Sequence, residues 1–204
     1  NYMQRVIPSR TDIEAIGAEN FVHPDLLSGT KAKFNFNSPS TKLNIVLLGT
    51  AHELRGMPLL NYDHHVSRYI QLIRGLHLKR VLGLEFYVKP KTTWETMEWF
   101  QSLTEISLNE ASASPRHIDM ENVVFLVNSF ASGAVLEGLA RGIPIFIVAP
   151  HATNSYLDLQ FDETMIVPNA EEALKKIERI TTVLDEFRIV RQKQLSWFER
   201  LIWQ

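Results

Sequence analysis

Short apolar runs alternate with longer amphipathic segments from residue 43 to the end of the chain. The runs are four to nine residues long and rich in Val, Ile, Leu and Phe, which is typical of strands buried on both faces of a parallel sheet. The pattern predicts strands at 43–48, 80–88, 105–108, 122–127 and 145–148, and a small edge strand at 165–167.

Apolar residues at helical spacing lie between these runs. In the segment 62–76 they fall at 62, 66, 69, 70, 73 and 76. A second helix is predicted at 93–103, with Thr92 or Thr93 as its N-cap, and a third at 132–141, ended by Gly142. Two final helices are expected at 170–187, capped by Asn169, and from 189 to the end.

Strands that alternate with helices in this way indicate right-handed β-α-β crossovers. The predicted fold class is therefore α/β, a Rossmann-like parallel sheet of about six strands with helices on both faces, over residues 42–204. Residues 1–41 are punctuated by Pro and Gly and show no core-forming periodicity. We expect them to be an interdomain connector or N-terminal extension, and the chain to be part of a longer protein.

Composition narrows the class of protein. The chain has 204 residues, 45% of them hydrophobic, a formal net charge of -2 and no cysteine. The apolar fraction excludes disorder as a description of the whole chain, and the balanced charge argues against nucleic acid as the main partner. Without cysteine there are no disulfides, thiolate zinc sites or cysteine nucleophiles. No apolar run or secretion signal indicates membrane insertion or export, so a cytoplasmic location is expected, with peripheral association at the inner face of the plasma membrane left open.

The segment 127–144 combines a strand end, a turn of small residues and a helix start. In an open parallel sheet, ligands bind at the carboxyl ends of the strands, where a helix N-terminus can hold a phosphate. Ser129, Ser132 and Gly133 permit close approach of the backbone, and Glu137 can accept both hydroxyls of a ribose. The alternative is that Ser132 only caps the helix and Glu137 is a surface acid.

The segment reads Ser-x-x-Ser-Gly-x-x-x-Glu-Gly-x-x-x-Gly-x-Pro and precedes an apolar strand. It resembles the nucleotide-sugar-binding segment of GT-B glycosyltransferases, most closely the bacterial enzymes that build capsule and other surface polysaccharides. The resemblance extends over about 43–204 in element order as well as motif. It implies that the small-residue turn (Ser129, Ser132 and Gly133) contacts the donor phosphates and that Glu137 holds the nucleotide ribose. Sugar 2-epimerases share the fold and the motif.

Two further segments offer groups for the phosphates or the sugar. Lys89-Pro90 is similar to the Lys-Pro-His-Pro segment of some surface-polysaccharide and sialic-acid transferases, although Lys91 stands where that family has His. The segment 49–56 corresponds to a glycine-containing loop of GT-B donor domains and contributes Gly49, Thr50, His52 and Arg55. The alternative is a plain turn for Lys89-Pro90 and a polar surface loop for 49–56.

The loop 149–155 faces the donor sugar in the resembling family, which makes His151 and Asn154 candidates, with an ordinary loop as the alternative. No metal site is expected, because Asp63, His64 and His65 are adjacent on a helix and point in different directions. The aromatic load of the last helix, Trp197, Phe198 and Trp203, predicts burial against another surface.

Together these features predict the donor-binding half of a GT-B glycosyltransferase. Its substrate would be a UDP-, GDP- or CMP-linked sugar, with no tightly bound cofactor, and its acceptor a cell-surface glycan. The resemblance assigns the acceptor site and the usual catalytic base largely to an N-terminal domain, so no catalytic base is named in this chain. The alternatives are a nucleotide-sugar 2-epimerase of the same fold and a non-catalytic Rossmann-like binding module.

Overall fold

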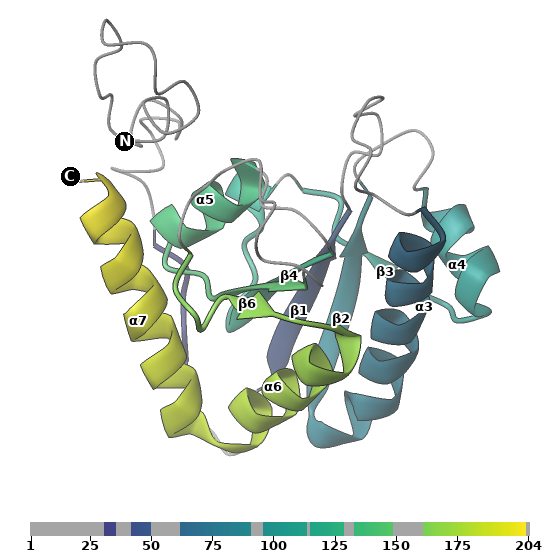
Figure 1. Cartoon of the computed structure of the whole chain (residues 1–204). Helices are drawn as coiled ribbons and strands as arrows, with labels where there is room; N and C mark the ends of the chain where they lie inside the picture. Colours follow the sequence, from purple (N-terminus) through teal and green to yellow (C-terminus); the bar gives the residue numbers. More distant parts are fainter. Residues whose placement is uncertain are drawn as a thin grey trace, which may run out of the picture.

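The computed structural model describes residues 31–35, 42–49, 62–90, 96–113, 115–128, 133–148 and 161–202. Its centre is one six-stranded sheet in the order β3-β2-β1-β4-β5-β6, in which every neighbouring pair is parallel (Figure 1). The strands are β1 (Leu43–Leu48), β2 (Leu84–Lys89), β3 (Asn109–Glu110), β4 (Val123–Asn128), β5 (Ile145–Val148) and β6 (Ile166–Val167). The predicted α/β class with a Rossmann-like parallel sheet is confirmed.

Helices cover both faces of this sheet (Figure 1). In chain order, the helices and 3-10 turns are α3 (Tyr62–Leu78), η2 (Lys79–Leu82), α4 (Met97–Thr104), η3 (Pro115–His117), α5 (Gly133–Ala140), α6 (Ala170–Thr182) and α7 (Leu184–Ile202). Helices α3, α4 and α6 share a core with one face, while α5 and the segment around η3 share a core with the other.

The strand sequence explains the two cores. Successive side chains of a strand point to opposite faces, so β1 sends Ile45 and Leu47 into one core and Val46 and Leu48 into the other. All four side chains are buried because both faces are covered, which is why β1 reads as an unbroken apolar run.

Helix α7 contributes to both cores. Phe187 near its start packs in the core of α3 and α6, and Phe198 near its end packs in the core of α5. Trp197 is half-buried and its ring centroid lies 5.3 Å from that of Phe161. Trp197 and Phe198, two of the aromatic residues singled out in the last helix, are therefore packed against their own domain, and Trp203 lies outside the described residues.

Residues 31–35 run along the domain and hydrogen-bond to it. The amide of Ala32 donates to the carbonyl of Arg141 at 2.8 Å, and the amide of Asn122 donates to the carbonyl of Lys33 at 3.0 Å. The ring of Phe34 also packs against Phe187. This segment lies in the range expected to be a connector, and its assignment to a connector or extension stays a prediction.

Several predicted element boundaries are wrong. The strand expected at 80–88 begins only at Leu84, because residues 79–82 form η2, which Gly83 ends at φ 83°. The strand expected at 105–108 is replaced by β3 at 109–110, because Glu105 adopts a left-handed conformation (φ 60°) and closes α4.

Helix α4 begins at Met97, and its N-cap is Thr96 rather than Thr92 or Thr93. The hydroxyl of Thr96 accepts the amide of Trp99 at 3.2 Å. The helix predicted over 170–187 ends at Thr182, and α7 begins at Leu184. Thr181 and Thr182 donate their hydroxyls to helix carbonyls four residues earlier, and β-branched residues of this kind favour a helix end.

Candidate functional site

The carboxyl ends of β1 and β4 form the topological switch point of the sheet. From β1 the chain builds outward through β2 to β3, then crosses to β4 and builds outward in the other direction. Leu48, the last residue of β1, is in register with Val127 of β4 and with Lys89 of β2. Open parallel sheets bind their ligands in the crevice at such a point.

Two of the predicted phosphate-binding residues, Gly49 and Lys89, lie at this edge. The amide of Gly49 donates to the carbonyl of Lys89 at 2.8 Å, which extends the β1–β2 pairing by one residue. The Lys89 ammonium donates to the carbonyl of Ser112 at 3.2 Å. Because Ser112 follows β3, this contact is on the side of β2 away from β1. Lys89 would have to leave it to reach a phosphate at the switch point.

Two more predicted residues, Gly133 and Glu137, lie on α5. Gly133 is the first residue of this helix, which follows β4 after a short connection, and Glu137 is one turn further and half-buried. The end of β4 and the helix start therefore flank residues 129–132, which lie outside the described residues. A helix that starts at the carboxyl end of a strand is typical of a phosphate site.

Gly138 explains how α5 is held on the sheet. A Cβ at this position would lie 2.8 Å from Cδ2 of Phe125 and 3.0 Å from Cδ1 of Ile145. Only glycine allows the helix axis to approach the strands this closely. Gly138 faces the sheet. Because successive residues of a helix point about 100° apart, Glu137 then lies at the side of the helix.

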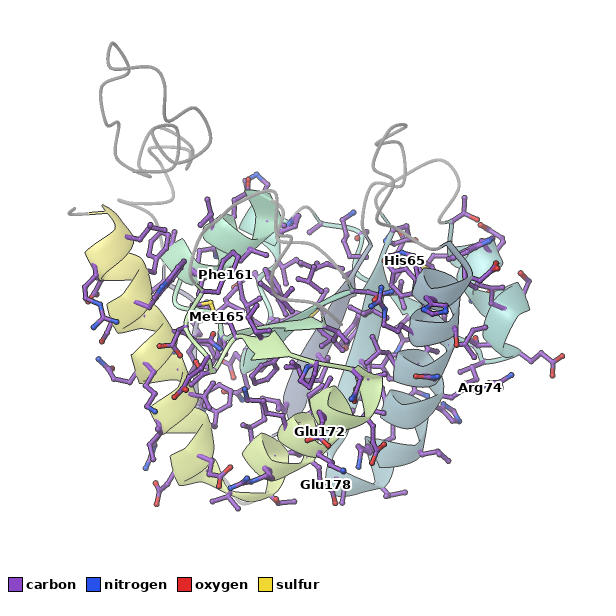
Figure 2. All side chains as sticks on the ribbon, in the orientation of Figure 1. His65, Arg74, Phe161, Met165, Glu172 and Glu178 are labelled. Atoms are coloured by element: carbon purple, nitrogen blue, oxygen red, sulfur yellow. The ribbon has the colours of Figure 1, made fainter. Side chains whose placement is uncertain are left out.

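Buried polar side chains lie at the switch point, and the sequence patterns did not predict them as site residues. Asn128, the last residue of β4, is fully buried and donates from Nδ2 to the carbonyl of His65 at 3.0 Å. His65 is itself fully buried, near the N-terminus of α3 (Figure 2). Its ring packs edge-on against Tyr69 with centroids 4.7 Å apart, and the Tyr69 hydroxyl makes a long contact of 3.5 Å to the carbonyl of Leu48.

The sequence does contain signals for these two buried polar residues. Asn128 directly follows five apolar residues of the same strand, and His65 lies on the apolar stripe of α3 that continues at Tyr69, Leu72 and Leu76. A polar residue on a buried stripe needs a hydrogen-bonding partner, so it indicates a specific contact. Asn128 ties the start of α3 to the end of β4.

The other predicted site residues lie outside the described residues. They are Thr50, His52 and Arg55 after β1, Ser129 and Ser132 after β4, and His151 and Asn154 after β5. Among the residues that the structure describes, no group of three or more His, Asp or Glu side chains can hold a metal ion. His65 is buried, while its neighbours Asp63 and His64 are exposed.

A scan against protein families and a search of curated proteins found no match to this chain. Within the described part of the chain, no helix is both long and apolar enough to span a bilayer.

Proposed function

We propose that this chain is the donor-binding domain of a GT-B glycosyltransferase, which transfers a sugar from a nucleotide-activated donor to a cell-surface glycan. The observation that carries the proposal is the start of α5 at Gly133, five residues after the end of β4, at the switch point of a 3-2-1-4-5-6 parallel sheet. Glu137, half-buried one turn into α5, supports it further.

In the proposed complex the donor phosphates meet the segment between β4 and α5 and the first amides of α5. The helix dipole and free N–H groups favour the negative charge that develops on the leaving nucleotide phosphate as the glycosidic bond breaks. Glu137 accepts hydrogen bonds from the ribose hydroxyls, and Lys89 and Arg55 supply positive charge to the phosphates. The domain binds and orients the donor, while the acceptor and the catalytic base belong to a second domain.

Isothermal titration calorimetry with UDP, GDP and CMP tests the proposal. One of these nucleotides should bind, and Glu137→Ala should weaken its binding by roughly 10- to 100-fold, as expected for the loss of hydrogen bonds to a charged group. Glu199→Ala removes an exposed carboxylate of α7 and serves as the matched control. Binding by none of the three nucleotides, or equal binding by the Glu137→Ala variant, would overturn the assignment.

A further inference from the structure

The turn that joins α3 to β2 exposes three aliphatic side chains in five residues. Val81 is 89% exposed, Leu78 73% and Leu82 37%. Across the described residues only two other large hydrophobic side chains are exposed, Val183 and Ile189. We call Leu78, Val81 and Leu82 with the cations Arg74, Lys79 and Arg80 the η2 surface.

The η2 surface carries excess positive charge. No acidic residue occurs between Asp63 and Glu85 in the sequence, although the whole chain has a net charge of -2. Arg74 is exposed on α3 (Figure 2). It comes four residues before Leu78, so the two side chains share one face of the helix. Glu178 of α6 pairs with Lys79 at 2.5 Å and neutralises one of the three cations.

The guanidinium of Arg80 is held in place beside the exposed aliphatic residues. It lies over the ring of Phe86, 4.8 Å from the centroid, which fixes the group at the base of the turn. The exposed aliphatic side chains therefore lie beside a cation that the turn holds in place.

We propose that the η2 surface docks on an anionic lipid bilayer. The aliphatic tips enter the boundary between headgroups and acyl chains, and Arg74 and Arg80 lie at the level of the lipid phosphates. Three aliphatic side chains without an aromatic residue are small for a stable protein interface, which buries about 800 Å² on each partner and is enriched in aromatic residues.

Docking in this way leaves the candidate nucleotide site free. The η2 surface precedes β2 and lies at its amino end, whereas Gly49, Lys89 and the start of α5 lie at the carboxyl ends of the strands. The proposed lipid binding and the proposed nucleotide binding can therefore be tested separately, because neither depends on the other.

Co-sedimentation of the chain with vesicles tests the proposal. The chain should sediment with mixed phosphatidylcholine and phosphatidylglycerol vesicles, and much less with phosphatidylcholine alone. The double variant Leu78→Ser with Val81→Ser should lower the partition coefficient roughly tenfold, because both side chains are exposed and are lost from the lipid contact rather than from the core. Ile189→Ser, at a residue 57% exposed on α7, should leave it unchanged.

Arg74→Gln tests the electrostatic part and should lower binding to the anionic vesicles about fivefold, whereas Arg188→Gln on α7 should not. Absence of sedimentation with anionic vesicles would overturn the proposal, as would equal binding by the Leu78→Ser, Val81→Ser variant. A dimer in light scattering that this double variant dissociates would assign the surface to a second copy of the chain and would also overturn it.

Discussion

Gln194 of α7 hydrogen-bonds to both backbone groups of Ile145, the first residue of β5. The amide of Ile145 donates to Oε1 at 2.7 Å, and Nε2 donates to the carbonyl of Ile145 at 2.9 Å. These backbone groups point toward β6, which pairs with β5 only at Ile147 and Val148. The side chain of Gln194 therefore takes the place of a neighbouring strand where β6 is too short.

Replacing Gln194 by Leu should lower the free energy of unfolding by about 2–4 kcal/mol, because two buried backbone groups lose their partner. The exposed Gln192 on the same helix offers a matched control, and Gln192→Leu should stay within about 0.5 kcal/mol of the parent. Chemical denaturation of both variants measures the difference. Equal stability of the two would contradict this role for Gln194.

Gly138→Ala should also destabilise the fold, although alanine is the better helix former. The added Cβ meets buried side chains of β4 and β5, and overpacking of this kind costs about 1–3 kcal/mol against about 1 kcal/mol gained in helix propensity. Thermal and chemical unfolding give the net loss. Phe125 supplies the closest atom to the added Cβ. The double variant Gly138→Ala, Phe125→Leu should therefore lose less stability than the sum of the two single variants. Strict additivity would show that this contact is not responsible.

Arg141→Met should lower the free energy of unfolding by about 1.5–3 kcal/mol. The guanidinium donates to the carbonyls of Pro115 and Ile118 at 2.8 and 2.7 Å and holds the segment around η3 against α5. Burial lowers the pKa of Arg141 from its ordinary value, and the nearby Asp119 opposes that shift. Arg188→Met on α7, an exposed residue, should change the unfolding free energy little, and amide exchange should increase around η3 only in the Arg141 variant.

The stability contributed by Glu98 should disappear in acid. Hydrogen bonds from its own backbone amide and from the Thr96 side chain lower the pKa of Glu98 below its ordinary 4.5. A carboxyl whose pKa is lower in the folded state stabilises the fold above its unfolded pKa and loses this contribution as the pH falls through the folded value. Glu98→Gln should therefore melt below the parent at pH 7, and the two melting curves should converge at a pH below 4.5. A pKa above 4.5 in an NMR titration would contradict the prediction.

In the proposed donor complex Lys89 contacts the phosphates, so Lys89→Gln should weaken the binding of a nucleoside diphosphate several-fold and leave the binding of the nucleoside unchanged. Calorimetry with UDP and uridine, or the pair for whichever base binds, separates the two effects. Lys193→Gln, an exposed lysine on α7, is the control. Equal loss for nucleotide and nucleoside would show that Lys89 acts by supporting the loop after β3 through Ser112.

The sequence alone was sufficient for the main elements of the fold. The apolar run at 43–48 is β1, Asn169 caps α6 through the amide of Glu172, and Gly142 ends α5 at φ 75°. These features depend on local spacing and on backbone preferences of single residues, which are visible in the order of the amino acids. They also placed Gly133 and Glu137 on the helix after β4, where the candidate site needs them.

The tertiary structure decided the contacts between distant segments. The partnership of Gln194 with Ile145, the buried link from Asn128 to His65 and the close approach at Gly138 join residues separated in the chain. The two polar contacts arise because a buried group without a local partner must find one elsewhere, and the contact at Gly138 arises because α5 packs closely on β4 and β5. No local pattern encodes which distant residue becomes the partner. The sequence therefore determined the helices and strands, and the tertiary structure determined the buried contacts beside the candidate site.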